Sequence, residues 1–235
     1  MTARDDASAA TVVERGRLGE LALRAVGEHY ELILNGMFLM DTRDGRSERL
    51  LASLALSDRP GPLRILIGGL GVGFSLAEAL SSDRVERVTV IEIEPKVIEW
   101  CRTALASFSG DALADPRVEI VNEDFATWLR RGEATFDGIC LDVDNGPSWT
   151  VTDANEALYA DEGLALLRQR LKPGGVLTVW SAAAAPKFEA ALRRVFDRVE
   201  AVSVPVPRGE PDVVYAASCV RTGAVSGRAS LSSSH

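Results

Sequence analysis

The chain has 235 residues, of which 46% are hydrophobic and 26% charged. This composition predicts one folded domain with a sizeable core, and it excludes a disordered or collagen-like protein. The formal net charge of −8 argues against a nucleic-acid partner, because phosphate binding needs a basic surface.

Cysteine and histidine are too few and too scattered for the chemistry they often support. The three cysteines form no CxxC pair, so we expect reduced thiols in place of a disulfide framework. With only two histidines we expect neither a metal site nor a Ser-His-Asp triad. Residues 1–10 lack an apolar signal-peptide core and no apolar run is long enough to span a membrane, so we expect a cytoplasmic protein without membrane contact.

The N-terminal part of the chain predicts a small antiparallel unit. We expect a flexible N-terminus over residues 1–18, followed by a β-hairpin and a short helix over residues 19–60. Asn35-Gly36 separates two apolar runs and favours a tight hairpin turn, because both residues tolerate positive φ. The apolar stretch Met37–Met40 is either core or an interface of a homodimer.

Over residues 61–221 short apolar runs alternate with helical patterns, which predicts βαβ units and a mainly parallel sheet. The last two strands, Val199–Val206 and Asp212–Ser218, have no helix between them and predict an antiparallel edge. The fold class is therefore α/β, a Rossmann-like domain with a seven-strand sheet. Residues 222–235 are rich in Ser, Gly and Ala and predict a disordered tail.

A glycine loop follows the first strand of this domain. Gly69, Gly71 and Gly73 let the backbone turn sharply and approach a ligand, and the helix that follows offers free N–H groups. Phe74 stands where a dinucleotide fingerprint has its third glycine, and the spacing is closer to that of loops that bind S-adenosylmethionine. The alternative is a tight strand–helix turn without a ligand.

Acidic residues follow the next two strands. Glu92 follows the glycine loop at the spacing typical of carboxylates that accept hydrogen bonds from ribose hydroxyls, and Ile93 offers an apolar face to adenine. Asp124 can accept from the adenine amino group and Phe125 can cover the ring. Asp124 is equally suited to capping the helix that follows, and the two roles are compatible.

Taken together, residues 19–218 resemble the polyamine synthase (spermidine synthase) branch of the class I S-adenosylmethionine-dependent transferases. The matching stretches are Tyr30–Gly36, Ile67–Gly73, Val88–Glu94, Asp115–Val118, Phe136–Pro147 and Leu171–Val176. The resemblance implies the class I methyltransferase fold. It also implies that Asp142 binds and deprotonates an attacking amine, with Asp144 as the second carboxylate of the same loop. The alternative is that both aspartates only shape the turn before Gly146-Pro147.

The chain also departs from this family. The family holds the amino end of decarboxylated S-adenosylmethionine with an Asp in the glycine loop, and Gly71 stands there instead. Leu39 replaces a Gln, and Gly45 and Glu48 replace a Glu and a Tyr. Backbone N–H groups at a helix start favour a carboxylate, so we expect intact S-adenosylmethionine to bind more tightly than its decarboxylated form.

The function expected from these observations is methyl transfer from S-adenosylmethionine to a small-molecule acceptor, cationic amines included. Three alternatives stay open. They are an aminopropyltransferase that uses decarboxylated S-adenosylmethionine, transfer of the 3-amino-3-carboxypropyl group, and a non-catalytic nucleotide-binding protein of the same fold.

Overall fold

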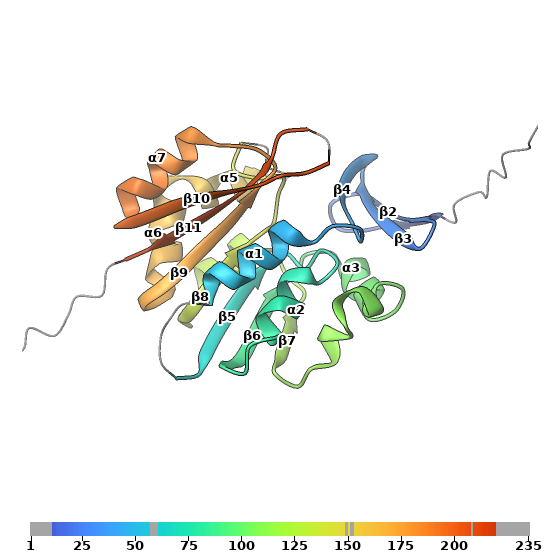
Figure 1. The fold of residues 1–235 in the computed structure, drawn as a ribbon, viewed down its shortest axis with the longest axis horizontal. Helices are drawn as coiled ribbons and strands as arrows, with labels where there is room; N and C mark the ends of the chain where they lie inside the picture. Colours follow the sequence, from blue (N-terminus) through green and yellow to red (C-terminus); the bar gives the residue numbers. More distant parts are fainter. Residues whose placement is uncertain (1–10, 57–60, 149, 151–152, 208, 220–235) are drawn as a thin grey trace, which may run out of the picture.

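The computed structural model describes residues 11–56, 61–148, 150, 153–207 and 209–219. They form two sheets (Figure 1). The smaller sheet is antiparallel and contains four strands in the order β1-β2-β3-β4, which are Thr11–Arg15, Glu20–Val26, His29–Leu34 and Met37–Asp41. Figure 1 shows that it lies beside the rest of the molecule, with helix α1 (Arg46–Ala55) leading out of it.

The hairpin predicted at Asn35-Gly36 is present. Asn35 and Gly36 both have positive φ, 50° and 77°, and they join β3 to β4. Within the stretch Met37–Met40, Phe38 is 52% exposed, whereas Leu39 and Met40 face the cavity described below. A homodimer interface over this stretch stays a prediction.

Strand β1 lies inside the segment 1–18 that the sequence analysis assigned to a flexible N-terminus. Residues 11–15 pair with β2 over the whole length of the strand, so this part of the assignment is corrected. The short strand exposes Val12 and Val13 and has no apolar–polar alternation, which is why its sequence gives no strand signal. Residues 1–10 and the predicted tail 222–235 lie outside the described residues.

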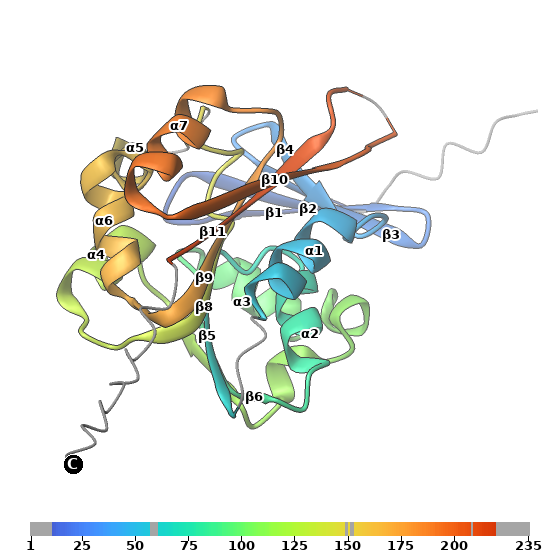
Figure 2. The same cartoon turned by 60° about the vertical axis from the view of Figure 1, so that its left-hand side comes forward.

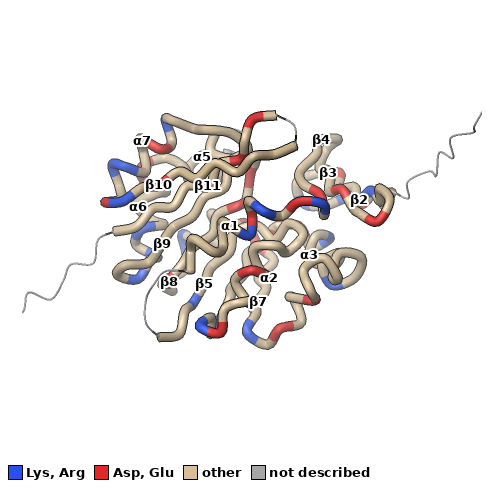
Figure 3. The backbone as a smooth tube through the Cα atoms, in the orientation of Figure 1, with Lys and Arg blue, Asp and Glu red and all other residues tan. Residues whose placement is uncertain are grey.

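The larger sheet confirms the predicted α/β Rossmann-like fold. Its seven strands have the order β10-β11-β9-β8-β5-β6-β7, in which β11 pairs antiparallel with both β9 and β10 and the other pairs are parallel. The strands are β5 (Leu63–Gly68), β6 (Val85–Ile91), β7 (Val118–Val121), β8 (Phe136–Leu141), β9 (Leu171–Ser181), β10 (Arg198–Val204) and β11 (Asp212–Ser218). Figure 3 shows that the central strands β5, β8 and β9 carry few charged positions, as expected for strands buried on both faces.

Helices cover both faces of this sheet (Figure 2). One face carries α1, α2 (Phe74–Leu80) and α3 (Pro95–Cys101), and the other carries α4 (Phe125–Arg131), α5 (Asp153–Tyr159), α6 (Asp161–Gln169) and α7 (Pro186–Val195). Two clusters of buried apolar side chains correspond to these two faces. None of the described helices is long and apolar enough to cross a membrane.

Two helical stretches of the chain are interrupted. Helix α3 ends at Cys101 and is followed by a short 3-10 turn, Ala106–Ser109. The stretch from Asp153 to Gln169 is divided at Ala160 into α5 and α6. Gly163 of α6 lies so close to the backbone of Ala157 and Leu158 that a Cβ atom there would overlap them, so the two helices meet at a tight corner.

Candidate active site

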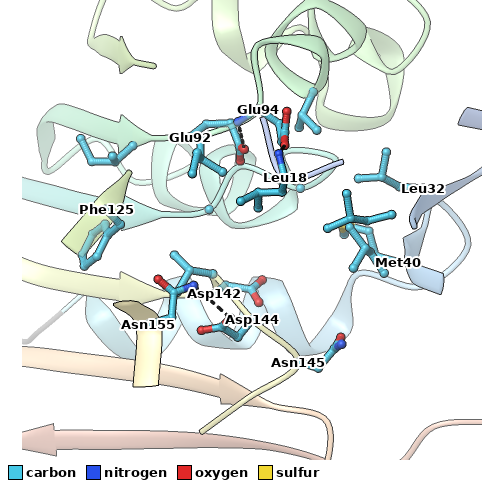
Figure 4. A pocket seen from close by; sticks show the side chains of 18 of the residues that line it. Leu18, Leu32, Met40, Glu92, Glu94, Phe125, Asp142, Asp144, Asn145 and Asn155 are labelled. Atoms are coloured by element: carbon cyan, nitrogen blue, oxygen red, sulfur yellow. Dashed lines mark hydrogen bonds between the residues drawn. The ribbon is translucent and has the colours of Figure 1, made fainter. Parts of the chain in front are cut away.

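A cavity lies between the carboxyl ends of the parallel strands and the N-terminal sheet (Figure 4). Ligands of open parallel sheets bind at this edge. One wall is formed by residues that follow β5, β6, β7 and β8, and the other by apolar side chains from the small sheet, which are Leu18, Leu21, Leu32, Leu34, Leu39 and Met40. All the predicted site residues except Gly73 line this cavity.

The glycine loop forms the floor of the cavity. All three glycines have positive φ, 85° at Gly69, 53° at Gly71 and 89° at Gly73. A Cβ atom at Gly69 would overlap the carbonyl oxygen of Asp142, so the loop passes directly against the end of β8. Gly73 caps the N-terminus of α2 and does not line the cavity.

Glu92 is buried at the end of β6, where its carboxylate organises the loop backbone. One oxygen accepts a hydrogen bond from the Leu70 N–H and the other from the Glu94 N–H, both at 2.8 Å. Burial raises the pKa of Glu92, and these two N–H donors oppose that rise. Each carboxylate oxygen has a second lone pair, so ribose hydroxyls can still be accepted. Ile93 lines the cavity beside it.

Asp124 and Phe125 lie on the neighbouring strand end. The Asp124 carboxylate accepts from the Thr127 N–H at 2.8 Å, so it caps α4 while also lining the cavity. The Phe125 ring is buried against Gly68, where a Cβ atom would come within 2.6 Å of the ring. The capping role is therefore present, and the role toward adenine stays a prediction.

The two aspartates of the loop after β8 have different environments. The Asp144 carboxylate is buried and accepts from Asn155 Nδ2 at 2.9 Å and from the Tyr159 hydroxyl at 3.0 Å. Figure 4 shows the Asn155 contact as a dashed line. Asp142 lines the cavity, and burial followed by repulsion from Glu48 holds its pKa well above the usual range. Asp142 is therefore the better candidate to meet a ligand, whereas Asp144 is held by Asn155 and Tyr159.

Glu94 links the two sheets. It is buried, and its carboxylate accepts from the backbone N–H groups of Arg17 at 2.8 Å and Leu18 at 2.6 Å. Figure 4 shows the Leu18 contact. Glu94 also precedes helix α3, but its side chain makes no capping bond there. Its actual partners are distant in the sequence, and no local signal indicates them.

The sequence analysis missed several residues of the cavity. Glu48 from the first turn of α1 was noted only as a departure from the family, and Met40 only as part of an apolar stretch. Leu18, Asn155 and Trp180 were not predicted. The signal available for Glu48 was a carboxylate in the first turn of a helix directly after the hairpin. The others are apolar or amide side chains without a motif.

The charge of the cavity has one sign. Among its described lining residues there is no Lys, Arg or His, and there are seven carboxylates, Glu48, Glu92, Glu94, Glu123, Asp124, Asp142 and Asp144. A site of this kind binds cations and disfavours a ligand carboxylate, which would lack a partner.

The chain is similar to known proteins over this same region. The family model for the spermine/spermidine synthase domain matches residues 46–219, more than half of the chain. Polyamine aminopropyltransferase 2 of Pseudomonas aeruginosa is 34% identical over 169 residues, which are 67% of this chain and 46% of that protein. The polyamine aminopropyltransferase of Mycobacterium tuberculosis is 33% identical over 164 residues, 68% of this chain and 30% of that protein. The chain thus spans less than half the length of these relatives.

Solved structures share the fold. Spermidine synthase from Thermotoga maritima superposes with a TM-score of 0.73 at 23% identity, over 89% of this chain and 72% of that one. A spermidine synthase in complex with the transition-state analogue AdoDATO superposes with a TM-score of 0.74 at 24% identity. The superposition covers 89% of this chain and 73% of that one.

These comparisons correct the expected function. Methyl transfer was expected because Gly71 replaces a loop aspartate. That expectation is wrong, since the family and the relatives are named for polyamine synthesis by aminopropyl transfer. The absence of one carboxylate at Gly71 does not remove the acidic character of the cavity, because seven other carboxylates line it. The resemblance itself is confirmed, and the chain belongs to the spermine/spermidine synthase domain family.

Proposed function

We propose that the chain transfers the aminopropyl group of decarboxylated S-adenosylmethionine to an amine acceptor. The observation that supports this most directly is the cavity lined by seven carboxylates and, among its described residues, no basic side chain. Both substrates of such a reaction are cations, and the decarboxylated donor lacks the carboxylate that intact S-adenosylmethionine would bring into this acidic site.

The nucleoside part of the donor would lie along the strand ends that the sequence singled out. Gly69 and Gly71 allow close approach of the ligand to the loop, and the Glu92 carboxylate accepts from the ribose hydroxyls. Ile93 and Phe125 enclose the adenine ring, with Asp124 facing its amino group. This assignment places the sulfonium toward Asp142 and the N-terminal sheet.

Asp142 acts on the acceptor. Its carboxylate orients the acceptor ammonium and takes a proton from it, which frees the nitrogen lone pair. The nitrogen then forms a bond to the aminopropyl carbon that is attached to sulfur, while the bond between that carbon and sulfur breaks. The electron pair of that bond stays on sulfur, which leaves as neutral methylthioadenosine. Positioning of the two substrates supplies most of the remaining rate.

The test is a product analysis with the purified chain, decarboxylated S-adenosylmethionine and a diamine such as 1,4-diaminobutane. We expect methylthioadenosine and an aminopropylated amine to appear in equal amounts in the mass spectrum, and Asp142→Asn to abolish both. In a parallel reaction with intact S-adenosylmethionine we expect no methylated amine. Methyl transfer without aminopropyl transfer would refute the proposal.

A further inference from the structure

The carboxylates of the cavity differ in whether the protein itself satisfies them. Five of the seven accept hydrogen bonds from groups that hold the fold together. Their donors are the Leu70 and Glu94 N–H groups for Glu92, the Arg17 and Leu18 N–H groups for Glu94, Arg131 for Glu123, the Thr127 N–H for Asp124, and Asn155 and Tyr159 for Asp144. The two that remain are Asp142, for which no such donor is found among the described residues, and Glu48, whose donors are its own backbone N–H and the hydroxyl of the adjacent Ser47.

Glu48 forms no ion pair with the described residues. Its carboxylate accepts from the hydroxyl of the adjacent Ser47 at 3.0 Å, and that hydroxyl also lies 2.8 Å from the carboxylate of Asp212. Burial and the neighbouring carboxylates of Asp212 and Asp44 raise the pKa of Glu48. A half-buried carboxylate among other carboxylates is costly unless a cation pairs with it. The neighbouring cation, Arg46, pairs with Asp44 and not with Glu48.

The backbone fixes Glu48 beside the glycine loop. Its carbonyl oxygen accepts from the Ser75 hydroxyl at 2.9 Å, and Ser75 lies in the first turn of α2, just after Gly73. Gly45, at the start of α1, packs so closely on the Phe74 ring that a Cβ atom there would overlap it. The beginning of α1 is therefore anchored to the beginning of α2, and Glu48 faces the cavity from that corner.

Glu48 and Asp142 face the same space. Repulsion from Glu48 is the largest contribution of any charged neighbour to the raised pKa of Asp142. One carboxyl group comes from the strand end and the other from α1, so the region between them has two acidic groups and no counter-charge among the described lining residues. Such a pair is complementary to two ammonium groups.

Neither Gly71 nor the small sheet supplies a further carboxylate here. At Gly71 a Cβ atom would lie 2.5 Å from the sulfur of Met40, so the loop has no room for a carboxylate side chain while Met40 is in place. The side chains that the small sheet contributes to the cavity, Leu39 and Met40 among them, are apolar. Among the described carboxylates that line the cavity, Glu48 and Asp142 are the ones left for an ammonium group, because the other five accept hydrogen bonds from the protein.

We infer that Glu48 is a specificity-determining residue that binds a primary ammonium group in the cavity, alongside the one held by Asp142. The inference rests on the proposed function, which brings two amine-bearing substrates into the site. The ammonium belongs either to the aminopropyl chain of the donor or to the second amino group of a diamine acceptor. Glu48 thus replaces a partner that the glycine loop of this chain does not provide.

The test compares Glu48→Gln with the wild-type chain by calorimetry and kinetics. The substitution keeps the shape and one acceptor atom but removes the charge. Binding of decarboxylated S-adenosylmethionine is set against binding of methylthioadenosine, which keeps the nucleoside and sulfur but has no ammonium. If Glu48 binds the donor, Kd for decarboxylated S-adenosylmethionine rises at least tenfold and Kd for methylthioadenosine is unchanged.

If Glu48 binds the acceptor, the donor Kd stays constant and KM for the diamine rises at least tenfold, while KM for a monoamine acceptor does not change. Glu48→Asp, which keeps the charge on a shorter side chain, should recover part of the loss in either case. Unchanged Kd and KM in Glu48→Gln overturn the inference.

Asp44→Asn is the matched control, since it removes the same charge one turn earlier, outside the cavity, where Asp44 pairs with Arg46. Asp44→Asn should leave Kd for the donor and KM for the diamine within twofold of the wild-type values. An equal rise of Kd or KM in Asp44→Asn and Glu48→Gln would show that only the total negative charge matters. That result would overturn direct ammonium binding by Glu48.

Unchanged methylthioadenosine binding also confirms that each variant is folded. If wild type binds methylthioadenosine but transfers no aminopropyl group to any amine, the proposed function fails and this inference fails with it. If wild type is active and Glu48→Gln behaves identically, only the inference fails.

Discussion

The sulfur of Met40 lies against Gly71, 2.5 Å from the position that a Cβ atom of residue 71 would occupy. Met40 comes from the N-terminal sheet and Gly71 from the glycine loop, so this contact joins the two walls of the cavity. A side chain at position 71 would therefore require Met40 to move, in addition to adopting the positive φ of 53°.

Gly71→Asp is expected to lower the free energy of unfolding for two reasons, the positive φ at residue 71 and the contact of the new side chain with Met40. The control is Gly110→Asp, at a glycine with a similar φ of 63° and open space around the added Cβ atom. We expect Gly71→Asp to cost on the order of 1–3 kcal/mol more than the control, the scale of overpacking. The measurement is urea denaturation. In a Met40→Ala background the excess should shrink, and an unchanged excess would show that Met40 is not the obstacle.

Glu92→Ala is expected to weaken methylthioadenosine binding by on the order of 1–3 kcal/mol, because it removes an acceptor from the ribose and releases two loop N–H groups. Calorimetry measures this. Glu119→Ala, which removes an exposed carboxylate paired with Arg87, should bind normally. Normal binding in a folded Glu92→Ala variant would remove the support for the ribose role.

Glu94→Ala is expected to release the turn between β1 and β2 from the Rossmann-like part. The N–H groups of Arg17 and Leu18 lose their carboxylate partner, at a cost on the order of 1–3 kcal/mol. Hydrogen exchange should become faster at residues 17 and 18, while the amides of β8 keep their protection. Uniform acceleration over both sheets would instead indicate global destabilisation.

The unliganded protein is expected to lose stability as the pH rises above the ordinary range of carboxyl pKa values. Asp142, Glu48 and Asp212 all have raised pKa values, with burial as the first cause. The native state therefore binds more protons than the unfolded state, and this contribution is present at low pH and disappears as the pH passes through the raised values. Carboxylates with lowered pKa values, such as Asp115, change the stability of the protein only below about pH 4. They therefore do not affect its stability at higher pH.

We expect Tm to fall between about pH 5 and pH 8, with each 1 kcal/mol lost corresponding to roughly 2–4 °C in a chain of this size. Differential scanning fluorimetry at constant ionic strength measures the curve. Asp142→Asn should flatten it and raise Tm at pH 8, whereas Asp161→Asn, at an exposed carboxylate paired with Arg194, should not. A Tm that rises over this range in wild type would contradict the assignment of these pKa shifts.

Much of the fold could be predicted because its signals are local. The turn at Asn35-Gly36, the apolar strands and the glycine loop each show within a short stretch of sequence. Glu92 and Asp124 could be placed at the cavity because the carboxyl ends of parallel strands meet at one edge.

The remaining features depend on contacts between distant segments. The bonds from Glu94 to residues 17 and 18, the packing of Met40 on Gly71 and the meeting of Glu48 with Asp142 arise only when the chain folds. The sign of the cavity's charge is a sum over carboxylates from Glu48 to Asp144, so no single motif reveals it. This is why one glycine could direct the sequence analysis to the wrong transferred group.

The uniformly acidic lining also determines how quickly ligands arrive. A concave site with charges of one sign attracts counter-ions from solution and raises the association rates of cationic ligands. Added salt shortens the range of that attraction, to about 8 Å at physiological ionic strength. The association rate of a diamine should therefore fall with rising salt concentration, whereas its dissociation rate, set by contacts inside the cavity, changes much less.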